Sequence, residues 1–119
     1  MLLNGYGISI AHGNTLRLKI SLKRDNGFTN QDKVVLKIRS DNEEQLLSKI
    51  LDISDNAVFF TLNSEESKQI TVGEHRWDIT VYINAQMDGE KITSAEEVIT
   101  PFFNAKFEVK KQASREVQQ

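Results

Sequence analysis

Hydrophobic and polar side chains alternate most strictly between residues 15 and 23. Apolar residues occupy every second position there, and charged or hydroxyl residues separate them: Leu16, Leu18, Ile20 and Leu22. A period of two is the pattern of a strand that buries one face. Asp25-Asn26-Gly27 follows and predicts a turn, because Asn and Gly tolerate positive φ. Residues 33–39 alternate in the same way and predict a second one-sided strand at the spacing of a β-sandwich.

Residues 41–53 are compatible with two structures. As a helix, the segment would be capped by Ser40 or Asp41, and the aliphatic residues between 46 and 51 would form its apolar stripe. As a strand, it would turn at residues 54–56 and pair in a hairpin with residues 57–62, whose core side would carry Val58, Phe60 and Leu62. The hairpin is favoured because the surrounding segments are predicted strands.

The next segments predict a short helix and another strand. Residues 63–68 are typical of one capped helical turn that crosses between layers, with Ser64 offering its hydroxyl to free backbone N–H groups. Residues 75–84 alternate again, and one face carries Trp77, Ile79, Val81 and Ile83.

Two features predict the last hairpin and the last strand of the domain. Residues 87–90 have the composition of a hairpin tip. Pro101 predicts the start of the last strand, because a missing N–H is tolerated at that position, and Phe103, Ala105, Phe107 and Val109 then alternate inward. Residues 111–119 are polar and predict a flexible C-terminal tail.

Together these elements predict an all-β domain over residues 1–110. About seven short strands, no long helix and turn signals about every ten residues indicate an immunoglobulin-like antiparallel β-sandwich. A small barrel is the alternative. The chain has 119 residues, which is enough for one core of ordinary size.

Composition and charge narrow the classes of function. Hydrophobic residues make up 39% and charged residues 27%, as in a globular domain. Residues 1–40 contain seven basic and two acidic side chains, and residues 41–66 contain one basic and seven acidic ones. Residues 67–119 contain seven basic and eight acidic ones, and the net charge of the chain is −2. This balance does not predict a nucleic-acid partner, and apolar runs of a few residues do not predict a membrane partner. The absence of cysteine excludes disulfides and indicates assembly in a reducing cytoplasm.

The sequence predicts no catalytic, cofactor-binding or metal-binding site. His12 and His75 are separated by 62 intervening residues and have no carboxylate at a ligand-like spacing, and no glycine-rich phosphate loop or nucleophile elbow is present. The two members of an adjacent acidic pair would point to opposite faces of a strand, so none of the three Glu-Glu pairs predicts a general acid and base. A small hydrolase remains an alternative only if one histidine meets a carboxylate in a pocket.

Four apolar residues fall on the polar phase of their predicted strands: Val35, Phe59, Tyr82 and Phe102. Such residues mark a protein contact only when the fold groups them. We take Phe59, Tyr82 and Phe102 as candidate contact residues.

Residues 62–79 have a recurring order: a core leucine, a short acidic turn, an aliphatic residue, glycine, an aromatic residue and an Asp-Ile strand. Two further segments belong to the same pattern. One lies before residues 62–79 and is Gly13-Asn14-Thr15-Leu16, and the other lies after them and is Met87-Asp88-Gly89-Glu90. Together these segments span most of residues 8–110. The pattern resembles the immunoglobulin-like N-terminal domains of phage upper-baseplate and tail-associated structural proteins.

The resemblance implies a non-enzymatic structural or interaction module of a phage or prophage virion, assembled in the bacterial cytoplasm. Its partners would be other virion proteins or further copies of itself. In the second case the protein would form a homo-oligomer. A carbohydrate- or cell-surface-binding β-sandwich is the alternative, and it predicts exposed aromatic rings along a shallow groove.

The same stretch predicts a structural corner. Gly73 permits the bend into the next strand. Immunoglobulin-like sandwiches often hold a tyrosine two residues later, whose hydroxyl bonds to upstream backbone. His75 occupies that position here and could donate the equivalent hydrogen bond, and Trp77 would fill the middle of the core.

Overall fold

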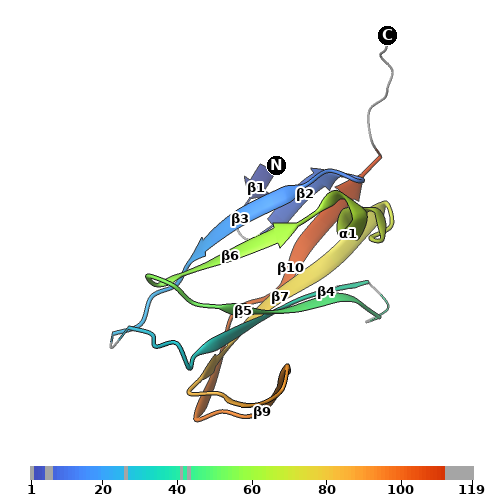
Figure 1. Cartoon of the computed structure of the whole chain (residues 1–119). Coiled ribbons are helices and arrows are strands. Elements are labelled where there is room, and N and C mark those ends of the chain that lie inside the picture. The colour runs from blue at the N-terminus through green and yellow to red at the C-terminus, as the bar shows by residue number, and fades with distance from the viewer. Residues whose placement is uncertain (1, 5–6, 26, 41, 43, 112–119) are drawn as a thin grey trace.

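Strands make up most of the chain in the computed structural model, which describes residues 2–4, 7–25, 27–40, 42 and 44–111, without the side chains of 2–4, 102 and 103 (Figure 1). The elements are β1 (Leu2–Asn4), β2 (Gly7–Ala11), β3 (Leu16–Ser21), β4 (Lys33–Ser40), β5 (Gln45–Asp52), β6 (Ala57–Leu62), α1 (Ser64–Lys68), β7 (Gly73–Ile83), β8 (Gln86–Asp88), β9 (Lys91–Ser94) and β10 (Glu97–Lys110). The all-β prediction is therefore confirmed. Residues 112–119 of the predicted tail lie outside the described residues.

The described strands form a six-stranded sheet in the order β1-β2-β10-β7-β4-β5, a two-stranded sheet β3-β6, and the hairpin β8-β9. The β3-β6 pair lies across one face of the larger sheet (Figure 1). The prediction of about seven antiparallel strands is wrong in two respects: ten strands are described, and β2 runs parallel to β10, with Ile8 opposite Phe107. Short edge strands and the β8-β9 hairpin lack the long alternation that reveals a strand in sequence.

The core lies between the two sheets and contains the residues that the alternation places inward. Leu16, Phe60 and Leu62 of the smaller sheet are at most 1% exposed, as are Leu36 and Trp77 of the larger one. The buried cluster is Ile8, Ile10, Leu16, Leu18, Ile20, Val34, Leu36, Ile38, Val58, Phe60, Leu62, Ile70, Trp77, Ile79, Val81, Ile83, Phe107 and Val109. Both sheets thus bury one face against a shared core, because alternate residues of a strand point to opposite sides.

Residues 45–52 are a strand, which settles the ambiguity over 41–53, but the predicted hairpin with residues 57–62 is wrong. β5 pairs with β4 in the larger sheet, and β6 pairs with β3 in the smaller one. Asp55 and Asn56 form a tight turn with positive φ, closed by the bridge between Ser54 and Ala57. The two strands separate beyond this bridge, because each pairs within a different layer.

Helix α1 is present as predicted and connects the two sheets, but Ser64 is not its cap. The Oδ1 atom of Asn63 accepts from the backbone N–H of Glu66 at 2.8 Å, and the Glu66 carboxylate accepts from the Asn63 N–H at 3.0 Å. This reciprocal pair is a capping box. The Ser64 hydroxyl instead donates to the carbonyl oxygen of Gly13 at 2.8 Å, which ties the helix to the loop before β3.

Pro101 does not start the last strand, which begins at Glu97. It lies inside β10, where the register with β7 shifts between Ile99 and Phe102. The parallel partner β2 pairs only with Phe107–Lys110. A missing N–H is tolerated at Pro101 because the ladder is irregular there and β2 does not extend to it.

Candidate interaction surface

One end of the outer face of the six-stranded sheet gathers apolar residues from four strands. Lys33 of β4 lies opposite Asp52 of β5 and Tyr82 of β7, and Tyr82 lies opposite Val98 of β10. The next row contains Ile50, Val35 and Thr80. Cross-strand partners share a face, and the intervening residue Val34 points into the core, so both rows face away from the core. We call these seven residues the outer patch.

The outer patch is partly exposed. Val98 is 55% exposed and Ile50 is 39% exposed, and Tyr82 is half-buried. Val35 is only 9% exposed, so the expectation that it would be a surface residue is wrong, although it lies on the predicted face. The patch therefore contains four apolar or aromatic residues, of which Val98 and Ile50 are exposed, beside the polar residues Lys33, Asp52 and Thr80.

The hairpin β8-β9 forms a hollow against this patch. It curls beneath the ends of β4 and β5 at the bottom of Figure 1. The hollow has a volume of 540 Å³ and is lined by Lys33, Ser48, Ile50, Asp52, Met87, Gly89 and Glu90. Met87 supplies a second apolar side chain, 38% exposed, opposite Ile50. The hollow thus combines two apolar side chains with three charged ones, Lys33, Asp52 and Glu90.

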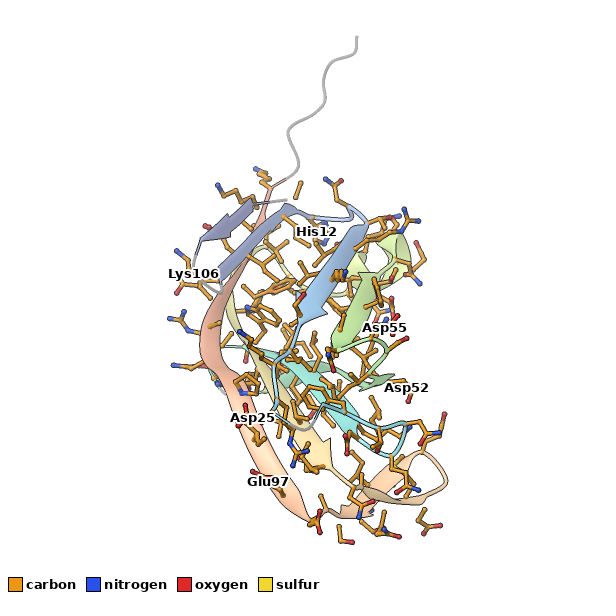
Figure 2. All side chains as sticks on the ribbon, turned by 90° about the vertical axis from the view of Figure 1, so that its left-hand side faces the viewer. His12, Asp25, Asp52, Asp55, Glu97 and Lys106 are labelled. Carbon is orange, nitrogen blue, oxygen red and sulfur yellow. The ribbon has the colours of Figure 1, made fainter. Side chains whose placement is uncertain are left out.

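The charged groups of the hollow are partly paired. The ammonium group of Lys33 donates to Asp52 at 2.7 Å and to the backbone carbonyl of Asn30 at 3.1 Å. Asp52 lies at the right-hand side of the molecule in Figure 2, near Asp55. The patch and the hollow thus share an ion pair whose carboxylate is exposed to solvent.

A buried ion pair holds the other end of the same face. The guanidinium of Arg39 donates to the two Asp78 oxygens at 2.9 and 3.2 Å, and also to the side-chain oxygen of Asn104 at 3.0 Å. The backbone N–H of Asn104 donates to Asp78 at 2.6 Å. Asn104 has φ of +62° and lies where the β10-β7 register shifts. The ion pair thus joins β4, β7 and β10 across the sheet.

The three candidate contact residues are not brought together. Tyr82 belongs to the outer patch, whereas Phe59 is 60% exposed on β6, in the other sheet. The Lys19 ammonium lies 5.9 Å from the centre of the Phe59 ring. Phe102 belongs to β10, and its side chain lies outside the described residues.

The corner at the start of β7 contains a glycine with positive φ and two buried side chains, those of His75 and Trp77. Gly73 has φ of +139°, a conformation that favours glycine. His75 is 5% exposed, and its Nε2 atom donates to the carbonyl oxygen of Thr71 at 2.7 Å. Its Nδ1 atom has no partner among the described residues. Trp77 is 1% exposed in the core. These contacts are structural ones.

The other histidine also contacts backbone. Nε2 of His12 lies 3.0 Å from the carbonyl oxygen of Lys68. In the part of the chain that the structure describes, both rings bond to backbone carbonyl oxygens and neither is paired with a carboxylate. The described residues contain no group of three or more His, Asp or Glu side chains placed to hold a metal ion. They also contain no helix long and apolar enough to cross a membrane.

Lys49 connects the two sheets beside the patch. Its ammonium group donates to the carbonyl oxygen of Thr61 at 2.7 Å and lies 2.9 Å from the Glu66 carboxylate. The hydrogen bond from the Asn63 backbone N–H, together with Lys49, lowers the pKa of Glu66 below its ordinary value. The edge strands β5 and β6 are therefore joined by one charged side chain.

Three residues of the surface were missed by the sequence analysis: Ile50, Met87 and Val98. Ile50 was hidden by the ambiguity of residues 41–53, since its face depends on pairing with β4. Met87 belonged to a predicted hairpin tip whose direction a sequence does not determine. Val98 falls before Pro101, where no strand was predicted. The Lys-Ile-Thr-Ser alternation of β9 was the available signal for strands in this region.

Comparisons with known proteins add no relative to this description. No family model matches the chain, and neither the curated proteins nor the solved structures yield a significant match.

Proposed function

We propose that this protein is a non-enzymatic protein-interaction module that binds an apolar segment of a neighbouring protein on the outer patch and in the adjoining hollow. The observation that carries the proposal is that two exposed apolar side chains from separate strands, Ile50 and Met87, line one hollow beside the sheet face that also exposes Val98. Contiguous exposed apolar surface with a polar border is characteristic of protein contacts.

We further propose an immunoglobulin-like topology for the two sheets. Three observations support it: β3 and β4 belong to opposite sheets, β7 lies between β10 and β4, and the His75 ring bonds to upstream backbone at the start of β7. In such a sandwich the sheets form a rigid body, and recognition falls to loops and one exposed face.

The proposed location is a phage or prophage virion, at the tail or baseplate, with other virion proteins or further copies as partners. This part of the proposal rests on the order of residues in 62–79 and on the absence of cysteine, which is typical of proteins that assemble in a reducing compartment. The carbohydrate-binding alternative needs aromatic rings along a groove. Among the described side chains, Phe59 is the exposed aromatic one, and it lies beside Lys19 on the other sheet.

The experiment uses the products of the adjacent genes as candidate partners. Each is co-purified with this protein, and the affinity of any complex is measured by calorimetry for the wild type, Met87→Glu and Phe59→Glu. Both substitutions add a carboxylate at an exposed apolar position, one in the hollow and one on the opposite sheet. We expect Met87→Glu to weaken binding about tenfold or more, as for a residue central to an interface.

Phe59→Glu should leave the affinity within about twofold, because surface residues outside an interface contribute little. Loss of binding in Phe59→Glu with retention in Met87→Glu would assign recognition to the other sheet and overturn the proposal. Adjacent genes of metabolic enzymes, with no complex formed by any of their products, would reject the virion location.

A further inference from the structure

A second hollow, which we call the inner hollow, opens toward the core at the corner where β3 ends. It has a volume of 330 Å³, and its described lining is Ser21, Leu22, Lys23, Phe28, Val81, Ile99 and Pro101. Five of these seven residues are apolar, and Val81 belongs to the buried core. Sites for small molecules are typically hollows of about 300 to 1,000 Å³ with mostly apolar walls and a few polar groups. The inner hollow has this character and lies at the small end of the range.

The inner hollow lies on the opposite side of the larger sheet from the outer patch. Val81 of β7 and Ile99 of β10 are cross-strand partners, and both line it. Their chain neighbours Tyr82 and Val98 are also partners of each other and belong to the outer patch. Because successive residues of a strand point to opposite faces, the two sites use different side chains of the same strands.

The inner hollow is present because no strand covers this part of the larger sheet. β2 pairs with β10 only at Phe107–Lys110, and the loop between β3 and β4 lies over the beginning of β10 instead. Leu22, Phe28 and Ile99 pack against the core there but are only half-buried. A ligand in the inner hollow would remove more of their apolar surface from water, which is favourable.

The loop that forms the outer wall is held in place at both ends. The Arg24 guanidinium donates to the Glu97 carboxylate of β10 at 3.2 Å. Asp32, which is 3% exposed, accepts from the backbone N–H groups of Thr29 and Asn84, both at 2.8 Å. The wall is therefore formed before a ligand binds, and this lowers the entropic cost of binding.

One cation lines the inner hollow. Lys23 is exposed and has no ion-pair partner among the described residues. Three further charged groups lie nearby without lining it: Arg24 and Glu97 pair with each other, and Asp25 lies above Glu97 in Figure 2. An anionic group at the rim would therefore meet one ammonium group that is not already neutralised.

We propose that the inner hollow binds a small carboxylate with an apolar body, such as a fatty acid of medium length. The chain lies between the two sheets against Val81 and Ile99, and the carboxylate lies at Lys23. A neutral molecule gains nothing from the ammonium group, and a cation is repelled by it. The volume limits the ligand to one short chain or one small ring system.

The first experiment locates a bound probe, sodium octanoate, by NMR on isotope-labelled wild type. We expect saturable binding, with intermolecular NOEs from the octanoate chain to the methyl groups of Leu22, Val81 and Ile99, and none to Ile50 in the hollow beside the outer patch. Absence of saturable binding would overturn the proposal. NOEs to Ile50 in place of Val81 and Ile99 would also overturn it.

The second experiment measures the affinities for octanoate and octylammonium by calorimetry in the wild type, Lys23→Gln and Lys19→Gln. Lys19 is an exposed lysine of β3 outside the inner hollow, so it serves as the matched control. Lys23→Gln should weaken octanoate binding about threefold to fivefold, as for an exposed ion pair, and Lys19→Gln should not change it. Octylammonium should bind the wild type more weakly than octanoate. Equal affinities for the two probes, or a loss in Lys19→Gln alone, would contradict the assignment of a carboxylate.

Two further variants separate this site from the proposed function. Ile99→Trp fills the inner hollow and should abolish octanoate binding in a protein whose NMR spectrum shows that it is folded. Met87→Glu changes the other hollow and should leave the octanoate affinity within about twofold, because separate sites act independently. Full octanoate binding by folded Ile99→Trp would overturn the proposal, even if Met87→Glu loses its protein partner as the proposed function requires.

Discussion

The two outer faces of the molecule are built from similar alternating strands but differ in what they expose. On the β3-β6 face, Arg17 and Lys19 alternate with buried leucines, and the one large exposed apolar side chain, Phe59, lies beside Lys19. The six-stranded face exposes Ile50 and Val98, its hollow is lined by Ile50 and by Met87 of the β8-β9 hairpin, and Arg39 and Asp78 form an ion pair within the same sheet. The β3-β6 face is an ordinary solvated surface.

The difference shows that an exposed apolar residue has meaning only through its neighbours. Phe59 is the most exposed of the large apolar side chains, yet the register surrounds it with polar positions. Val98 and Ile50 are less exposed, but they are connected through Tyr82, Lys33 and Val35. Grouping is decided by strand order, which is a property of the fold and not of the local pattern.

The largest expected effect tests the ion pair on the six-stranded face. Arg39→Met should lower the free energy of unfolding by about 3 to 5 kcal/mol, because it leaves the buried Asp78 carboxylate without its cation. Arg17→Met on the β3-β6 face should change it by less than about 0.5 kcal/mol. Urea denaturation of both variants measures the two values. Equal losses would contradict the asymmetry of the two faces.

A smaller effect tests the bend that the ion pair maintains in β10. Asn104 has positive φ and bonds to both Arg39 and Asp78. Asn104→Ala should cost about 1 to 3 kcal/mol from backbone strain and the lost hydrogen bond. Asn104→Gly relieves the strain and should cost less. Thermal unfolding compares the two variants. If Asn104→Gly melts at a lower temperature than Asn104→Ala, backbone strain at position 104 does not explain the effect.

The connection between the two sheets predicts a dependence on pH. The Asn63 N–H and Lys49 lower the pKa of Glu66, so its carboxylate contributes stability in full above about pH 4.5, and this contribution is lost as the pH falls through the folded-state pKa. Glu66→Gln should therefore be less stable than the wild type at pH 7, and the difference should shrink in acid. Chemical denaturation at pH 7 and pH 3 measures it, and a difference that grows in acid would contradict this assignment.

The smallest effect concerns Phe59. Phe59→Ser should change the free energy of unfolding by less than about 0.5 kcal/mol, because the ring is 60% exposed and contacts Lys19 at the surface. Differential scanning calorimetry would show nearly unchanged melting. A loss of more than about 2 kcal/mol would show that the β3-β6 face is as constrained as the opposite one.

Alternation was sufficient to predict the strands that build the core. Leu16, Leu18 and Ile20, and likewise Val34, Leu36 and Ile38, are buried as the period of two requires. The partners of β5 and β6 were not predictable in the same way. A tight turn at Asp55-Asn56 indicates a hairpin locally, whereas the burial of each strand in a separate layer is decided by the whole core.

The candidate surface was predicted only in part. Tyr82 and Val35 were identified because they interrupt a clear alternation, and both lie in the outer patch. Met87 and Val98 were not, because their positions depend on how the hairpin and the irregular start of β10 fold back on the sheet. The ion pair of Arg39 with Asp78 joins residues 39 positions apart, and a sequence gives no signal for such a distant pair.

Thiol protection tests the central claim most directly, because the chain has no cysteine of its own. Met87→Cys and Phe59→Cys each place one thiol on one outer face, and alkylation by iodoacetamide is measured in the free protein and in the complex with its partner. The account predicts that binding slows alkylation at position 87 about tenfold or more and leaves position 59 unchanged. Protection at position 59, with unchanged alkylation at position 87, would contradict it.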